Sequence, residues 1–285
     1  MRETPYISAV CGRFHGAFLS VAGACTLAVT GACDAGAVEP ECAPEALPPA
    51  MVAAVTDART LRLQSGESVR LAGALAPEPP GWWKESGPWP AAREAREEVE
   101  RLVLGKRVAL RFAPGEARRD RHERYLAQLV VLGGERPLWL QAHLVGAGHA
   151  RAYSLSGRRA CARTLQKVEA AARAKTAGFW KGPVFRVWNS ARTGELLKRL
   201  GSFQAVEGTV ASVGRTRKWT FLNFTSDWRT DFTVAVEARY RRTFEGSDVD
   251  LAMLEGRRVL VRGWLERWNG PVIKATHPEQ IELID

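Results

Sequence analysis

The stretch from Val55 to Pro80 combines residues that could handle a phosphate group. Arg59 and Arg70 lie in short alternating runs, and Glu78 follows in a proline-rich segment. Guanidinium groups bind phosphate oxygens, whereas hydrolysis assisted by a divalent cation usually needs two or more carboxylate ligands. The stretch is therefore richer in anion-binding groups than in metal ligands.

A second basic run, ARRDRHER, covers residues 117–124 and includes Arg121, His122 and Arg124. Such a run suits contacts with a phosphate backbone, although a solvated loop without a ligand would have the same composition. The histidines of the chain do not lie at zinc-ligand spacing with one another or with cysteine. We therefore expect no metal or cofactor from these residues.

The overall charge also favours an anionic partner. The net charge is +10 and the sequence pI is about 9.8, which suits nucleic acid, anionic lipid or an acidic polymer. The hydrophobic fraction of 46% and the charged fraction of 25% are those of a folded globular protein. A glycine-rich phosphate loop, a Ser–His–Asp pattern and a dinucleotide fingerprint are all missing from the sequence.

Residues 1–37 are expected to be a signal peptide. Positive charge precedes the apolar run AFLSVAGACTLAVTGA, which is too short and too rich in small residues for a good membrane span. Cleavage before Val38 would follow the small residues AGA. Alternatively, Cys33 is a lipidated first residue that anchors the protein in a membrane. Both interpretations predict an exported protein of the periplasm or cell envelope.

Residues 38–50 form a proline-rich linker without periodicity, and this linker contains Cys42. Cys42 and Cys161 are the cysteines that follow the expected signal peptide. In an oxidising compartment they are expected to form a disulfide that ties the linker to the domain behind it. Two buried free thiols are the alternative, and sequence separation does not decide between them.

Residues 51–182 have the periodicities of a domain that combines strands and helices. Alternating runs predict strands at Met51–Val55, Thr60–Gln64 and Ser68–Ala72. Further strands are predicted at KRVALRF and RYLAQLVVL, and helices at AAREAREEVERLVLG, WLQAHLVGAG and CARTLQKVEAAARAKTAGFW. These elements are the ones that must position the arginines and Glu78.

Residues 183–202 are expected to be a connector, helical in part, and residues 203–285 a second small barrel of strands. The pair Asn269-Gly270 predicts a hairpin within it. The segment LNFTSDWRTDFTVAV contains Trp228 and is either a ligand loop or a polar hairpin with a buried tryptophan. The second interpretation is favoured.

Residues 51–182 resemble the staphylococcal nuclease (thermonuclease) family in the order of their strands and helices. Five local strings carry the resemblance: VTDARTLRL, VRLAGALAPE, DRHERYLAQLVV, WLQAHLVGAGHARAY and VEAAARAKTAGFW. It implies an α+β fold, in which a five-stranded oligonucleotide-binding barrel carries three helices. Residues 203–285 resemble such a barrel in outline only.

The resemblance also implies roles for individual residues. In that family, two aspartates and a backbone oxygen hold calcium, a glutamate orients or activates water, and two arginines stabilise the charge that develops on phosphate. Arg70 and Arg124 match the two catalytic arginines, and Glu78 matches the glutamate. Tyr153 matches an aromatic residue of the nucleotide pocket, and His122 replaces another.

The chain departs from the family at the metal-binding positions. The two metal aspartates are replaced by Arg59 and Leu75, and Asp57 matches a supporting position. Glu78 and Asp57 supply too few oxygen ligands for firm calcium binding. We expect Arg59 to pair with Glu78, so that a charge-assisted contact replaces the metal.

The sequence therefore predicts an exported protein that binds nucleic acid or another polyanion at Arg59, Arg70 and Arg124, here called the arginine cup. Arg121 and His122 would add contacts, and phosphodiester cleavage would be lost or weak. The alternatives are an active calcium-dependent nuclease and an envelope scaffold that binds protein or cell-wall polymer. A further alternative is that the arginines make only structural ion pairs.

Overall fold

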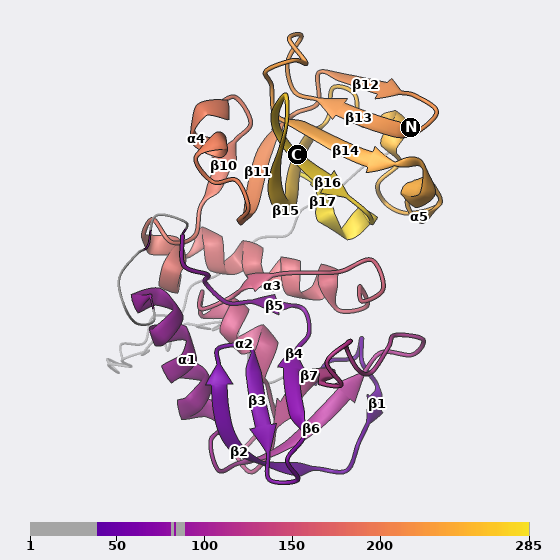
Figure 1. The fold of residues 1–285 in the computed structure, drawn as a ribbon. Coiled ribbons are helices and arrows are strands. Elements are labelled where there is room, and N and C mark those ends of the chain that lie inside the picture. The colour runs from indigo at the N-terminus through magenta and orange to yellow at the C-terminus, as the bar shows by residue number, and fades with distance from the viewer. Residues whose placement is uncertain (1–38, 81–82, 84–88, 285) are drawn as a thin grey trace, which may run out of the picture. The chain divides into compact units, whose positions relative to one another are not determined.

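The computed structural model describes residues 39–80, 83 and 89–284 (Figure 1). The expected signal peptide of residues 1–37 and the possible lipid site at Cys33 lie outside the described residues. The described residues all belong to one compact unit. Among them, no helix is long and apolar enough to cross a membrane.

Strands and helices alternate through the first part of the chain. In chain order they are β1 (Glu45–Ala46), β2 (Ala50–Asp57), β3 (Thr60–Leu63), β4 (Ser68–Leu71), β5 (Ala74–Leu75), α1 (Pro90–Val103), β6 (Arg107–Phe112), β7 (Tyr125–Val131), β8 (Leu138–Trp139), α2 (Leu140–Gly146), β9 (Arg151–Ala152), α3 (Ala162–Ala174) and the 3₁₀ turn η1 (Gly178–Lys181).

Five of these strands, β2, β3, β4, β7 and β6, close into what we call the first barrel. β2, β3 and β4 form an antiparallel meander, and β4 pairs in parallel with β7. β7 then pairs with β6, and β6 returns to β2, which closes the ring. Alternation in each strand buries one row of side chains in a core that includes Leu61, Val69, Leu110 and Leu129.

The helices of the first part cover this barrel as the residue pattern predicts. In α1, Ala91, Ala95, Val99 and Leu102 are buried because they recur at helical spacing. Pro90 fits the first turn, where its missing N–H leaves no bond unmade. The expected α+β fold with a five-stranded barrel is confirmed.

The second part of the chain is built mainly of strands. Its elements are β10 (Val187–Asn189), α4 (Thr193–Leu197), β11 (Phe203–Thr209), β12 (Ser212–Arg215), β13 (Trp219–Asn223), β14 (Thr233–Glu237), η2 (Ala238–Tyr240), α5 (Arg241–Phe244), η3 (Leu251–Met253), β15 (Arg258–Trp268), β16 (Gly270–Ala275), η4 (Pro278–Gln280) and β17 (Ile281–Leu283). Residues 183–202, expected to be a connector, thus contain α4 and also β10, which pairs in parallel with β11.

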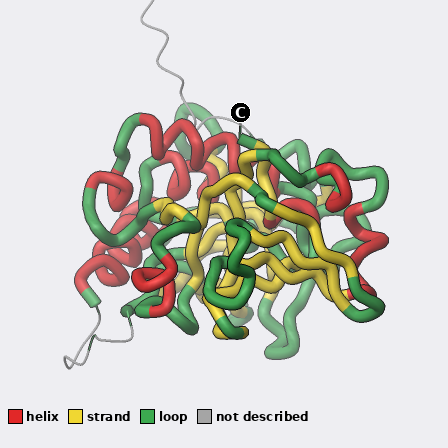
Figure 2. The backbone as a smooth tube through the Cα atoms, turned by 90° about the horizontal axis from the view of Figure 1, so that it is seen from above, coloured by secondary structure: helices red, strands yellow, loops and turns green. Residues whose placement is uncertain are grey.

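The second sheet also closes into a ring, which we call the second barrel. β12, β13 and β14 are an antiparallel meander, β14 pairs in parallel with β16, and β15 joins β16 to β11. β11 and β12 are halves of one bent strand. Val210 N–H donates to the Arg257 carbonyl on one side, and Ala211 N–H donates to the Asn223 carbonyl on the other. Figure 2 shows the strands in yellow at the middle of the view, with helices in red at its sides.

Two local expectations about the second barrel have different outcomes. The hairpin at Asn269-Gly270 is confirmed, with Asn269 in the left-handed region at φ 62° and Trp268 opposite Gly270. The interpretation of Trp228 as a buried residue was wrong, because its exposed fraction is 50%. Asp231 of the same segment is buried instead, and its carboxylate accepts hydrogen bonds from Phe224 N–H and Thr225 N–H.

A buried ion-pair network joins α3 to the second barrel. Arg262 on β15 donates to Glu169 on α3 and to Glu282 on β17, each at 2.7 Å. The side chains of Arg262 and Glu169 are only 3% and 2% exposed. Figure 1 shows α3 between the strands of the two barrels. The two barrels are therefore connected by charge as well as by the chain.

The disulfide between Cys42 and Cys161 is present, so the alternative of two free thiols was wrong. It joins the segment before β1 to the residue at the start of α3, across 119 positions of sequence. The strands of the first barrel, α1 and α2 therefore all lie within the covalent loop that the disulfide closes.

Candidate nucleic-acid interface

Arg59 lies in the tight turn between β2 and β3, and its guanidinium contacts Glu78. The turn is held by Asp57, whose Oδ1 accepts a hydrogen bond of 2.7 Å from the Arg59 N–H. Arg59 Nη2 lies 3.4 Å from Glu78 Oε1. Burial and the neighbouring charge of Arg70 lower the pKa of Arg59, while Glu78 and Asp57 act in the opposite direction. The expected Arg59–Glu78 contact is thus made, with both side chains partly exposed.

Arg70 stands beside Arg59 because β3 and β4 pair with Thr60 opposite Arg70. Its Nη1 donates to the Thr60 hydroxyl at 3.1 Å. Among the described residues, Arg70 has no carboxylate partner within ion-pair distance. A hydroxyl leaves the positive charge uncompensated, so Arg70 is the cation of this region that an anion could most readily approach.

Tyr153 completes a cluster with Arg59, Arg70 and Glu78, which we call the Arg59 cluster. Burial raises the pKa of Tyr153, while the charges of Arg59 and Arg70 act to lower it. Its ring also packs edge-on against Phe203 of the second barrel, with ring centroids 5.5 Å apart. Tyr153, which the resemblance assigns to a nucleotide pocket, therefore also makes a packing contact with the second barrel.

The loop between β6 and β7 holds the other predicted residues, and Asp120 organises it. Asp120 accepts from Arg124 Nε at 2.8 Å and from the backbone N–H groups of His122 and Arg124. Although burial alone would raise the pKa of Asp120, these hydrogen bonds hold it below its usual value. Arg124 is thus ion-paired with Asp120, and its hydrogen bonds are made within this loop and not with the Arg59 cluster.

Arg121 and His122 occupy the exposed tip of the same loop. Arg121 Nε donates to His122 Nε2 at 3.1 Å, so the two side chains lie together. Neither side chain has a carboxylate partner among the described residues. The predicted site residues therefore form two groups of mutual contacts, the Arg59 cluster and this loop, at the neighbouring strands β4 and β7.

The residues that the resemblance assigns to the metal positions do not fit a calcium ion. Arg59 places a guanidinium beside the one nearby glutamate, and Leu75 is an apolar core residue with no exposed surface. Within the part of the chain that the structure describes, no group of three or more His, Cys, Asp or Glu residues could hold a metal ion. Calcium requires six or more oxygen ligands, and these residues do not supply them.

Sequence reasoning missed Arg151, a buried cation that interacts electrostatically with Glu78 of the Arg59 cluster. Arg151 pairs with Leu75 across the β5–β9 ladder, and its Nε has no hydrogen-bond partner in the structure. Its guanidinium packs against the rings of Phe185 and Phe203. Burial lowers the pKa of Arg151 to about 10, and the charges of Glu169 and Glu78 oppose that shift. The run HARAY contained the signal, because strand alternation puts Arg151 and Tyr153 on one face.

The comparison with protein families agrees with this geometry. Residues 68–182 match the family model described as Staphylococcal nuclease homologue. This part of the chain is a staphylococcal-nuclease-like domain. The match begins at Ser68, so β2, β3 and Arg59 precede the matched residues although they complete the barrel. No curated protein matches the chain.

The staphylococcal-nuclease-like domain contains Arg70, Glu78, Arg124 and Tyr153 within its matched residues. The match indicates a nuclease-type family that binds nucleic acid. The roles of the individual side chains stay predictions, because the match concerns the domain and not its residues.

Proposed function

We propose that the staphylococcal-nuclease-like domain binds nucleic acid or another polyanion, and that its calcium-dependent phosphodiester cleavage is lost or weak. The observation that carries the proposal is the contact of 3.4 Å between Arg59 and Glu78. This contact uses the one glutamate of the family pattern and puts a positive charge where the family holds a cation.

The physical argument concerns charge. A guanidinium repels calcium and competes for the carboxylate that would orient water, so Arg59 opposes both parts of the family's chemistry. The same positive charge attracts a phosphate group. Arg70, with a hydroxyl as its partner, and Arg121, at the exposed loop tip, support anion binding without a metal.

We also propose that the protein is exported, to the periplasm or another part of the cell envelope. The Cys42–Cys161 disulfide supports this, since disulfides persist in oxidising compartments. Mass measurement of the protein recovered from fractionated cells tests it. A mass that begins at Val38 is expected, a lipid-modified Cys33 would replace cleavage by anchoring, and an uncut cytoplasmic chain would contradict export.

The test of the main proposal is cleavage of a fluorescent single-stranded DNA by the chain from Val38 onward. Reactions with calcium and with a chelator are compared, together with Glu78→Ala and Arg124→Ala variants. We expect no calcium-dependent cutting, and binding that Arg124→Ala weakens. Calcium-dependent cutting that both variants lose would instead establish a working nuclease.

Salt dependence separates polyanion binding from an envelope scaffold. Binding to DNA through phosphate contacts falls steeply with salt, because each contact releases counterions. A protein that shows no salt-sensitive DNA binding, yet retains an envelope protein or cell-wall polymer, would favour the scaffold.

A further inference from the structure

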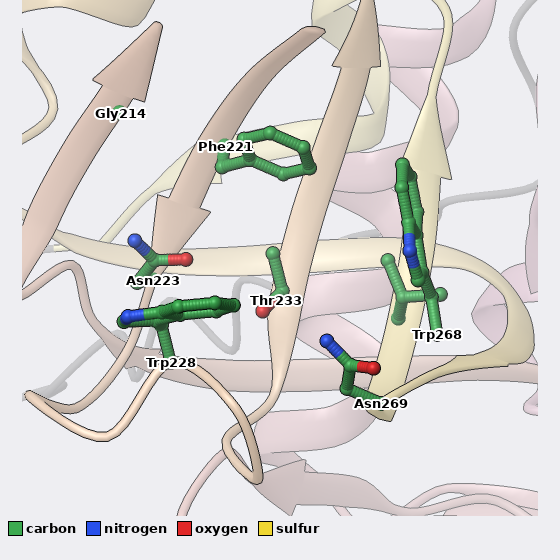
Figure 3. Close-up of a pocket in the computed structure, with 8 residues that line it drawn as sticks. Gly214, Phe221, Asn223, Trp228, Thr233, Trp268 and Asn269 are labelled. Atoms are coloured by element: carbon green, nitrogen blue, oxygen red, sulfur yellow. The ribbon is translucent and has the colours of Figure 1, made fainter. Parts of the chain in front are cut away.

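The second barrel carries a pocket that is separate from the Arg59 cluster. It lies over β12, β13, β14 and β16 and has a volume of about 360 Å³. Phe221, Trp228 and Trp268 surround it, from a strand, a loop and a hairpin respectively, and Figure 3 shows Trp228 and Trp268 on different sides of Thr233. The pocket is therefore walled by aromatic rings from three different elements.

The aromatic walls are exposed although they are large. Trp228 is 50% exposed and Trp268 is 42% exposed, whereas Phe224 and Phe232 of the same barrel are buried. Trp268 packs edge-on against Phe221 at 5.5 Å and against Trp219 at 5.0 Å between ring centroids. These contacts fix the orientation of the Trp268 ring at the pocket edge and leave part of the ring exposed. Exposed rings fixed in this way are suited to stacking against a flat ligand.

The floor of the pocket carries polar side chains beside an apolar one. Asn223 on β13 lies opposite Thr233 on β14, and Thr233 lies opposite Val272 on β16, so the three form a row across neighbouring strands. Asn269 adds a second amide from the hairpin (Figure 3). Amide and hydroxyl groups can both donate to and accept from the edge of a nucleobase.

Two features leave the pocket open and hold its walls in place. Gly214 lies opposite Phe221 and has no side chain to cover the ring; a Cβ there would meet no atom within 4 Å. Gly270 lets the loop that carries Trp228 lie against the hairpin, because a Cβ at Gly270 would be 2.1 Å from the Asp231 carbonyl oxygen. Asp227 ties the same loop internally through Thr230 Oγ1.

The loops that carry the rings also carry exposed cations. Arg229 stands 4.5 Å from the ring centroid of Trp228, and Arg267 directly precedes Trp268. Arg215 ends β12, and Arg217 and Lys218 lie in the turn between β12 and β13. Among the described residues, these five cations have no carboxylate within ion-pair distance, whereas Glu237 and Glu266 are paired with Arg239 and Lys274. Arg229 therefore places a positive charge at one wall of the pocket, and the other four cations add positive charge to the adjoining strand ends and turn, here called the rim. This charge suits an anionic polymer better than a neutral sugar chain.

We propose that this pocket binds single-stranded nucleic acid, with a base stacked between the aromatic walls and the backbone along the cations of the rim. A duplex keeps its bases stacked inside and cannot present one to the rings, so single strands are preferred. The inference stands independently of the arginine cup, since it uses residues of the second barrel alone.

The test is fluorescence anisotropy of a short labelled oligothymidylate with the full chain. Trp268→Ala and Trp228→Ala should each weaken binding by about fivefold or more, the lower end of what one stacked base contributes. Gly214→Leu should weaken it as well, because a side chain there fills the pocket while every ring is kept. Met253→Ala, which truncates a side chain that is 71% exposed and outside the pocket, is the control and should bind as the unaltered chain does.

Two further measurements make the outcome decisive. Arg70→Ala/Arg124→Ala removes cations of the arginine cup, and the effect of Trp268→Ala must persist in that background. If it vanishes there, the strand binds at the arginine cup and the inference is overturned. Equal affinity for duplex, or binding of a neutral glucan oligosaccharide without the oligonucleotide, would also overturn it. Thermal unfolding of each variant checks the fold, and the exposed tryptophans can be truncated without opening the core.

Discussion

The two barrels share one strand order but present different chemistry to solvent. In each ring a meander of three strands is followed by a parallel pairing, and the fourth strand in sequence returns to the first. The first barrel presents charged side chains that are largely paired with one another, such as Arg59 with Glu78 and Arg124 with Asp120. The second presents exposed rings, together with cations such as Arg229 and Arg267 that have no carboxylate within ion-pair distance among the described residues.

The difference indicates that barrel topology and ligand chemistry are set by different residues. The topology depends on buried rows such as Leu61 and Leu129 in one barrel and Val234 and Ile273 in the other. Ligand chemistry depends on turns and outward rows, which can change without disturbing the core. A fold resemblance therefore predicts barrel topology better than it predicts ligand chemistry.

Breaking the disulfide should produce the largest difference in stability between the two barrels. The bond closes a loop of 119 positions, and the chain-entropy argument gives about 5 kcal/mol of stability for a loop of that size. Cys42→Ala should lower the free energy of unfolding by about 2–5 kcal/mol, measured by urea denaturation. Cys161→Ala and the double variant should lose no more, because any one of the three breaks the same bond.

Hydrogen exchange then tells which barrel is affected. We expect amides of β2, β3 and β7 to lose protection in Cys42→Ala, while those of β14 and β16 keep it. Equal loss in both barrels would show that the two rings unfold as one unit.

Removing one member of the buried ion-pair network should cost a similar amount of stability. Glu169→Ala leaves Arg262 buried beside Glu282 alone, and a charge deprived of its buried partner costs about 3–5 kcal/mol. Although burial alone would lower the pKa of Arg262, Glu169 and Glu282 raise it, so it stays charged. Arg258→Ala on the same strand is the matched control, because its pair with Glu207 is partly exposed and such pairs contribute about 1 kcal/mol at most.

Acid should weaken the contact between the barrels through His277. Its imidazole is buried, with Nε2 at 2.8 Å from Ser154 Oγ, and burial with the charges of Arg159 and Arg163 lowers its pKa to about 4. The unfolded chain takes up a proton near pH 6.5 and the folded chain does not, so stability falls as pH drops below 6.5.

Between pH 6.5 and pH 5 this linkage amounts to about 2 kcal/mol. The measurement is the free energy of unfolding across that range, and His277→Gln should flatten the dependence. An equally steep curve in the variant would assign the effect to other groups.

The smallest expected effect is a difference between the two barrels in the salt dependence of nucleic-acid binding. Arg70→Ala should weaken binding modestly and reduce the slope of log K against log salt by about 0.7 for a single strand, the value of one phosphate contact. Trp268→Ala should weaken binding with little change in slope, because stacking releases no counterion. Anisotropy titrations at several salt concentrations provide both quantities, and matching slopes for the two variants would remove the distinction between the barrels.

Local patterns predicted most of the backbone. The strand predictions at Met51–Val55, Thr60–Gln64 and Ser68–Ala72 fall within one or two residues of β2, β3 and β4, because alternation with period two is a local signal. The first long helix was likewise predicted from its apolar spacing. The family match at residues 68–182 adds the domain that these elements form.

Long-range contacts were not predictable in the same way. Glu169 and Arg262 are 93 positions apart, and each looks like an ordinary charge in an apolar run until the fold brings them together. Trp228 was wrongly interpreted as buried, because sequence alone does not show that Asp231 anchors the loop in its place. The resemblance assigns Arg124 to a catalytic position, yet its guanidinium forms an ion pair with Asp120 four residues away.

The Cys42–Cys161 bond also determines how the chain would carry a mechanical load. A force applied at both ends of the described chain passes through the sulfur atoms and bypasses the 119 positions between them. Those residues could otherwise extend by about 400 Å. Under tension the second barrel would therefore yield first, and the strands of the first barrel would stay folded inside a covalent ring.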